Sequence, residues 1–199
     1  LSHFRLNNSK EAENYFKRGL AEAPKYISIL NNIGLSHFKL SNFKEAETYF
    51  KRGLAEAPKY ISILNNLGNL KGYLNLNKSA IEYFNKILKI NDKLIEPYFN
   101  LAINYQALGE FEKSSECLKK ILELNPKFTD ADRMLSIMTK YTNNHPHYFN
   151  IKDKLENIKL NEFQKSHLYF ALGKYFEDIN DYEKSYKNYL YGNKIIKKK

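Results

Sequence analysis

Apolar side chains recur every three or four residues along much of this chain, which is the spacing that places them on one face of an α-helix. One such stretch covers residues 30–40 and a second covers residues 43–54, with the polar link Ser41-Asn42 between them. Pro58 follows the second stretch, and proline lacks the amide hydrogen that a helix interior requires. The pattern predicts a pair of antiparallel amphipathic helices joined by a tight turn.

This helix pair is repeated along the chain. The sixteen-residue segment KRGLAEAPKYISILNN occurs unchanged at residues 17–32 and 51–66, a period of 34 residues. Residues 1–34 and 35–68 differ only at Arg5/Lys39, Asn7/Ser41, Ser9/Phe43, Asn14/Thr48 and Ile33/Leu67. Each helix pair leaves an apolar face that only a neighbouring pair can cover, so a copied unit indicates a stacked array.

The repeated unit resembles the tetratricopeptide repeat, whose 34-residue pattern has large residues at positions 4 and 7, small ones at 8, 20 and 27, aromatic ones at 11 and 24, and proline at 32. With Ile27 as position 1, the matching residues are Leu30, Ile33, Gly34, Ala46, Phe50, Gly53 and Pro58. The unit departs from the pattern at position 11, which is His37, and the next unit has Lys71 and Asp92 at positions 11 and 32. The resemblance implies an all-α fold, a right-handed superhelical solenoid of antiparallel helix pairs. The small residues at positions 8 and 20 are expected to let the paired helices approach closely.

The quality of the repeat divides the chain into three predicted segments. Residues 1–126 form an array with a partial first unit and units that start at residues 27, 61 and 95. Residues 127–160 form a degenerate repeat and irregular joint, in which Thr129 to Tyr141 is a first helix and Pro146 opens a short irregular one. Residues 161–199 form a last tetratricopeptide-like helix pair, with Asn161 as its N-cap.

The last segment is also similar to the end of the repeat region in bacterial proteins whose tetratricopeptide units precede a sulfotransferase domain. The residues that carry this resemblance are Phe170, Ala171, Leu172, Gly173, Glu177, Asp178, Asp181, Tyr182, Gly192 and Asn193. The resemblance implies an acceptor-presenting region with a catalytic domain beyond residue 199. Residue 1 is a leucine inside a repeat unit, so we also expect sequence before it. No phosphate-binding glycine loop is expected within the chain, because the repeat pattern already explains almost every glycine.

The formal net charge of +10 raises the question of an anionic partner. Basic residues recur on the outward part of the second helices, namely Lys17, Arg18, Lys51, Arg52, Lys86, Lys119 and Lys120. Acidic residues share these helices, which favours a solvated surface over a nucleic-acid site. No apolar run approaches the roughly 18 residues of a membrane span. The single cysteine, Cys117, fits a semi-buried helix position and a reducing compartment, so we expect a cytoplasmic protein that binds no membrane.

Asparagines provide the candidate binding residues. Position 6 of the first helix is Asn32, Asn66 and Asn100 in three successive units, and Asn65 and Asn69 extend the polar strip. An asparagine side chain can bond a peptide backbone without reading its sequence, because it offers one acceptor and two donors. Peptide-binding members of the family use asparagines in this way. The resemblance therefore implies that an extended peptide or a partner protein binds along the concave face.

Two other kinds of site, one that binds a C-terminal carboxylate and one that binds a metal, lack the residues that they would require. Positions 2 and 6 lack the Lys and Arg pair with which some family members grip a C-terminal carboxylate: they are Ser62 and Asn66, Glu96 and Asn100, and Asp130 and Met134. His145 and His147 flank Pro146 in what reads as a loop, but a metal requires three or four converging ligands.

Glu177 and Asp178 are adjacent on a helix and should diverge, so an acid-base pair is not expected. We predict a protein-interaction scaffold without catalytic residues, cofactor, metal or small-molecule substrate in this chain. The alternatives are the sulfotransferase-associated region and a basic surface that binds nucleic acid.

Overall fold

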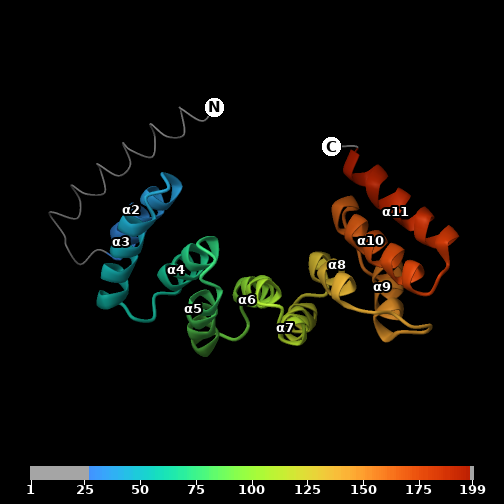
Figure 1. The fold of residues 1–199 in the computed structure, drawn as a ribbon, viewed down its shortest axis with the longest axis horizontal. Helices are drawn as coiled ribbons and strands as arrows, with labels where there is room; N and C mark the ends of the chain where they lie inside the picture. Colours follow the sequence, from blue (N-terminus) through green and yellow to red (C-terminus); the bar gives the residue numbers. More distant parts are fainter. Residues whose placement is uncertain (1–26, 198–199) are drawn as a thin grey trace. The chain divides into compact units, whose positions relative to one another are not determined.

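The computed structural model describes residues 27–197, which form ten α-helices and no strand (Figure 1). The predicted all-α class of helix pairs is confirmed for this part of the chain. The partial unit predicted before Ile27, with Lys17 and Arg18, lies outside the described residues, as do the last two lysines. None of the helices between residues 27 and 197 is both long and apolar enough to cross a lipid bilayer.

The helices belong to two compact units that meet at Leu108 and Gly109, and each unit is described by itself. The first unit contains α2 (Ile27–Lys39), α3 (Phe43–Glu56), α4 (Ile61–Tyr73), α5 (Asn77–Ile90) and α6 (Ile95–Ala107). The second contains α7 (Phe111–Leu124), α8 (Thr129–Met138), α9 (Pro146–Asn157), α10 (Glu162–Asp178) and α11 (Tyr182–Lys197). The division into segments at residues 126 and 160 concerns the repeats and stays a prediction.

Two hairpins build the first unit. Helix α2 packs on α3 and α4 on α5, and α5 also packs on α6. The core between the hairpins consists of side chains that are almost fully buried: Ala46, Phe50, Ile63, Leu67 and Leu70. A neighbouring hairpin thus covers the apolar face that each hairpin leaves open, as the repeat predicted.

Glycine at position 8 allows the close approach of paired helices. A Cβ atom added to Gly68 in α4 would lie 2.6 Å from the ring of Phe84 in α5. In the second unit, a Cβ atom on Gly173 would lie 2.6 Å from the ring of Tyr189. Since carbon atoms in contact lie about 3.5–4.0 Å apart, any side chain at these positions would push the paired helix away. The predicted role of the small residue at position 8 is confirmed.

A residue in the left-handed conformation lies two positions before each of the helices α3, α5, α7 and α11. These residues are Ser41, Asn75, Gly109 and Asn180, with φ angles of 62°, 58°, 74° and 63°. Glycine adopts this conformation without strain and asparagine at a low cost, whereas other L-residues lose about 1–2 kcal/mol. Ser41 is therefore the least favourable of the four turn residues.

We expect Ser41→Gly to raise the free energy of unfolding by about 0.5–1 kcal/mol, because relief of the strained φ exceeds the entropy that glycine adds to the unfolded chain. Urea denaturation followed by circular dichroism measures this change. Ser41→Ala serves as the control and should not stabilise, since alanine is strained at the same angle. Equal stability of the glycine and alanine variants would contradict the explanation.

The joint between the repeats is more helical than its sequence indicated. Helix α8 ends at Met138, three residues earlier than predicted, and residues 146–157 form a regular α-helix with Pro146 in its first turn. Pro146 opens a helix as predicted, although this helix is regular, and the interpretation of His145 and His147 as part of a loop was wrong. The reason is that His145 caps the helix through its side chain, which accepts the His147 amide at 3.2 Å. The predicted N-cap of α10 is confirmed, since Asn161 and Gln164 form a reciprocal capping box.

A buried polar network holds this joint together. Asp132 of α8 is fully buried, and both of its oxygens accept hydrogen bonds of 2.8 Å from Lys154 of α9. His147 Nε2 lies 3.2 Å from the same carboxylate, and His147 Nδ1 lies 2.6 Å from the hydroxyl of Tyr141. Two side chains of α9 thus meet the carboxylate of α8, and Tyr141 of the intervening segment joins the network through His147. The network compensates for the apolar pattern that this degenerate repeat lacks.

Candidate functional site

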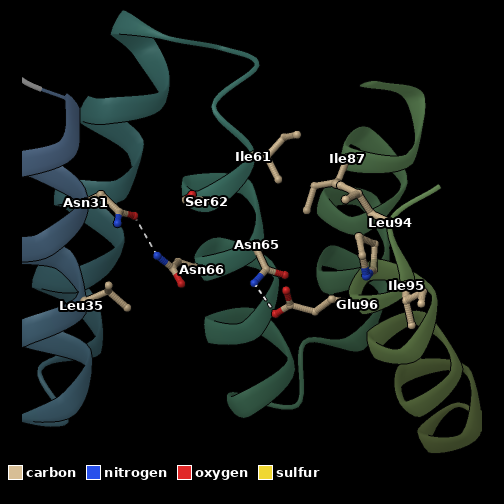
Figure 2. Close-up of a pocket in the computed structure, with 11 residues that line it drawn as sticks. Asn31, Leu35, Ile61, Ser62, Asn65, Asn66, Ile87, Leu94, Ile95 and Glu96 are labelled. Carbon is tan, nitrogen blue, oxygen red and sulfur yellow. Dashed lines mark hydrogen bonds between the residues drawn. The ribbon is translucent and has the colours of Figure 1, made fainter. Parts of the chain in front are cut away.

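The first helices of the first unit line a hollow of about 550 Å³ (Figure 2). Helix α2 contributes Asn31 and Leu35, helix α4 contributes Ser62, Asn65 and Asn66, and Glu96 comes from the start of α6. Apolar side chains near the ends of α4, α5 and α6, and of the residue that precedes α6, complete the lining: Ile61, Ile87, Leu94, Ile95 and Pro97. The hollow combines amide groups, one carboxylate and an apolar border.

Its asparagines form hydrogen bonds from one first helix to the next. Asn66 Nδ2 donates to Asn31 Oδ1 at 2.7 Å, so α4 is joined to α2. Asn65 Nδ2 donates to Glu96 Oε1 at 2.8 Å, and these two side chains extend toward each other in Figure 2. Asn100 of α6 donates back to Asn65 Oδ1 at 3.4 Å. A hydrogen bond from the asparagine at position 6 of one unit to the asparagine at position 5 of the preceding unit therefore occurs twice.

A second hollow of about 310 Å³ adjoins the first toward the ends of the same helices. Asn100 also donates to Asn69 at 3.2 Å, and both of these residues line the second hollow, whereas Asn65 lines the first. Apolar and aromatic side chains form much of its lining, notably Phe38 of α2, Tyr73 of α4 and Ile103 of α6. The rings of Tyr73 and Phe38 pack in a T-shaped arrangement, with 5.6 Å between ring centroids. The hydrogen-bonded amides thus line both hollows, and the first hollow also contains a carboxylate.

Four of the five asparagines that the sequence singled out lie together in this region. Asn65 and Asn66 line the first hollow, Asn69 and Asn100 line the second. Asn32 is half-buried on α2, and the residue that this helix contributes to the first hollow is its neighbour Asn31.

Sequence reasoning missed Asn31 and Glu96. Asparagine at position 5 in two successive units, Asn31 and Asn65, was a signal that could have indicated the first of them. Glu96 had no such signal, because its role depends on the distance between α4 and α6.

The other chemically reactive groups are engaged in packing. Burial raises the pKa of the Cys117 thiol in α7 to about 11, so a thiolate is disfavoured at neutral pH. Glu177 accepts a hydrogen bond from the Tyr189 hydroxyl at 2.8 Å, whereas Asp178 faces Lys174 and the segment before α9, so the two carboxylates diverge as predicted. Among residues 27–197, no three His, Cys, Asp or Glu side chains are placed to hold a metal ion together.

Asp178 fastens the segment between α8 and α9 to helix α10. It accepts hydrogen bonds from the Tyr141 amide and Lys140, both at 3.1 Å, and from Lys174 at 2.6 Å. Burial alone would raise the pKa of this carboxyl, but the three donors outweigh burial and lower the pKa to about 2. Asp178 therefore stays ionised at neutral pH and has a structural role.

Two more residues of the sulfotransferase-like segment have structural roles. Asp181 precedes α11 and accepts the backbone amide of Lys184 at 3.2 Å. A Cβ atom on Gly192 would lie 3.1 Å from the ring of Phe170. Packing within the last helix pair accounts for these residues without reference to a catalytic domain.

Comparison with protein families gives three matches, all described as tetratricopeptide repeat. They cover residues 1–61, 61–94 and 95–128, which together span the chain from residue 1 to residue 128. The search of curated proteins found no matching sequence.

Solved structures of the same architecture resemble the chain over most of its length. PilF of Pseudomonas aeruginosa has a TM-score of 0.69 at 12% identity, and the match covers 97% of this chain and 91% of that one. MamA of Desulfovibrio magneticus RS-1, from residue 41 to its end, has a TM-score of 0.63 at 14% identity, with 100% and 92% covered. YrrB, described as a TPR protein with an unusual peptide-binding site, has a TM-score of 0.59 at 15% identity, with 91% and 83% covered. At these identities the likeness establishes the fold alone.

The matched repeat segments, the helix hairpins and the glycine contacts at position 8 agree on one family. This chain is a member of the tetratricopeptide repeat family.

Proposed function

We propose that the first unit is a protein-interaction module that holds an extended peptide against α2, α4 and α6. The observation that carries the proposal is the row of hydrogen-bonded asparagines Asn31, Asn66, Asn65 and Asn100 beside the two hollows. Amides suit this task because a peptide backbone presents alternating donors and acceptors, which asparagine can match without reading side chains.

The asparagines retain hydrogen-bonding capacity after their mutual contacts are made. Asn66 uses one N–H toward Asn31, and no described residue donates to its oxygen. The same is true of Asn100, whose side-chain nitrogen donates to Asn65 and Asn69 while its Oδ1 accepts from no described side chain. The mutual hydrogen bonds fix the side-chain orientations in advance, which lowers the entropy lost when a ligand binds.

The descriptions of two structural neighbours support a peptide as the ligand. YrrB is described as having a peptide-binding site, and a further neighbour, the first TPR of Spaghetti (RPAP3), is described as bound to the HSP90 peptide SRMEEVD. The chemistry of this groove is different from that of an acidic-tail receptor, because its described lining has no Lys or Arg and one Glu. We therefore place peptide binding here without assigning a chaperone tail as the ligand.

Selection from a library of random twelve-residue peptides on the full chain tests the proposal, and the affinity of a selected peptide follows from fluorescence anisotropy. We expect Asn66→Ala with Asn100→Ala to weaken binding about tenfold or more, the loss expected for two hydrogen bonds of about 0.5–1.5 kcal/mol each. Helical circular dichroism should remain. The control is Asn85→Ala, an exposed residue of α5 outside both hollows.

Unchanged affinity of the double variant would remove the asparagines from the site, and failure to select any peptide would overturn the proposed function. Single variants at Asn31 and Asn32 decide which face of α2 the ligand meets. We expect Asn31→Ala to have the larger effect, because Asn31 lines the first hollow.

The two other functions named from the sequence gain no support. Asp178, Asp181 and Gly192, which are among the residues that resembled a sulfotransferase-associated region, have structural roles, and none of the matches described above is to such a protein. In the basic stripe, Lys51 pairs with Glu47 at 2.7 Å, and Arg52 and Lys86 lie over the rings of Tyr49 and Tyr83. Nucleic-acid binding, a cytoplasmic location and a catalytic domain beyond residue 199 stay predictions without a supporting observation.

A further inference from the structure

We infer that the groove selects peptides with a basic residue and an apolar or aromatic residue about three positions apart. This inference rests on the proposed peptide-binding function and assigns a different role to each hollow. The basic side chain pairs with Glu96 in the first hollow, and the apolar side chain enters the second hollow beside Tyr73 and Ile103.

Glu96 supplies the charge of the first hollow. Among the described residues that line the two hollows, Glu96 is the one with a formal charge. Asn65 donates to its Oε1 at 2.8 Å, and no described residue donates to Oε2. The hydrogen bond fixes the carboxylate over the groove while Oε2 remains available to a Lys or Arg of the ligand.

The overall positive charge of the chain would favour acidic partners, whereas Glu96 favours a basic ligand residue. The formal net charge is +10, but charges in water interact little beyond about 8 Å at physiological ionic strength. A ligand side chain in the groove would contact Glu96 directly, whereas Lys51, Arg52 and Lys86 of the basic stripe lie on the second helices α3 and α5. The local carboxylate therefore decides which side-chain charge is accepted.

The second hollow provides an apolar surface for the other residue. Tyr73 is 64% exposed and Ile103 is 44% exposed, although each lies beside buried or half-buried apolar groups. Gly68 and Gly72 of α4 also line this hollow, so the helix backbone there carries no side chain that would fill the space. An aromatic or aliphatic side chain of a ligand would cover the exposed faces of Tyr73 and Ile103.

Helix geometry sets the spacing between the two ligand residues. Glu96 and Ile103 lie seven residues apart on one face of α6, which corresponds to about 10 Å along the helix. An extended peptide advances about 3.3 Å per residue, so about three residues span this distance. Both directions, basic-x-x-apolar and apolar-x-x-basic, satisfy the geometry.

The sequences of peptides selected on the full chain test the inference. We expect enrichment of Lys or Arg with Phe, Tyr, Leu or Met three positions away, in one direction or the other. Selected peptides without this pair, or with acidic residues instead, would overturn the inference and leave the proposed function intact. If no peptide is selected at all, the result contradicts the proposed peptide-binding function itself, and with it the inference.

Charge variants assign the basic residue to Glu96. For a selected lysine-containing peptide, Glu96→Lys should raise Kd at least about threefold, in the range of a partly exposed ion pair and its reversal, and should favour the peptide in which Glu replaces Lys. Glu96→Gln keeps an acceptor for Asn65, so it should lose the charge preference without loss of helicity. The control Glu82→Lys makes the same charge change on an exposed residue of α5 and should leave Kd unchanged. Equal effects at residues 82 and 96 would show that only net charge matters.

A matched pair of variants assigns the apolar residue to the second hollow. Ile103→Asp should abolish the advantage of a peptide with Phe over the same peptide with Ala, because the hollow loses its apolar wall. Ile137→Asp changes an isoleucine of α8 that is 64% exposed and lies in the second unit, and it should preserve this advantage. Retention of the advantage in Ile103→Asp would contradict the assignment.

Discussion

Asp132→Ala is expected to lower the free energy of unfolding of the second unit by about 3–5 kcal/mol, the cost of leaving a buried charge without its partner. Asp132 is fully buried, and its two oxygens accept hydrogen bonds of 2.8 Å from Lys154 Nζ. Without this carboxylate, Lys154 and His147 would remain buried with no acceptor at these positions. Urea denaturation followed by far-ultraviolet circular dichroism measures the loss.

Two further variants test whether the loss of stability comes from the buried pair of Asp132 and Lys154 and not from the removal of any carboxylate. Asp153→Ala removes an exposed carboxylate from α9, one residue from Lys154, and should change stability by no more than about 0.5 kcal/mol. The double variant Asp132→Leu with Lys154→Met should lose much less than the sum of the two single losses, because it removes both charges and retains apolar volume. Additive losses would show that the two residues do not act as a pair.

Phe84→Ala is expected to cost about 3–5 kcal/mol in the first unit, the range for truncation of a buried phenylalanine. The ring is 1% exposed and lies against Gly68, which has no side chain that could move into the cavity. Phe111→Ala provides the control, because Phe111 of α7 is 52% exposed and its truncation should cost far less. Urea denaturation again measures the change.

The contact between Gly68 and Phe84 predicts that Gly68→Ala has opposite effects on stability in the native chain and in the Phe84→Ala variant. In the native chain, Gly68→Ala places a methyl group about 2.6 Å from the Phe84 ring and should destabilise by about 1–3 kcal/mol through overpacking. In the Phe84→Ala background that space is open, and alanine favours the helix over glycine by about 1 kcal/mol. Gly68→Ala should therefore stabilise the truncated variant. Destabilisation in both backgrounds would contradict the explanation of position 8.

These two sites differ in how much of them the sequence could predict. Gly68 and Phe84 occupy positions 8 and 24 of a repeat, and the recurrence of a small residue and a large one at this spacing predicted a close contact. Asp132, His147 and Lys154 recur in no other unit, so their convergence had no periodic signal. The same holds for Glu96, which meets Asn65 across 31 residues of sequence.

The candidate groove was also predicted only in part. The sequence placed a strip of asparagines on the first helices, and four of the five lie at the two hollows. Which neighbour on α2 lines the groove, Asn31 or Asn32, depends on the rotation of that helix against α4. A repeat position specifies such a rotation only to within about one residue, or 100° around the helix.

The sequence by itself determined the helices, their pairing into hairpins and the family, because the 34-residue period records the contacts that each unit makes with its neighbours. Tertiary structure decided the packing of the joint around Asp132 and the position of Glu96 opposite Asn65. The physical reason is that apolar contacts between repeats depend on local periodicity, whereas a buried ion pair or a groove depends on distances between side chains that only the packed helices set.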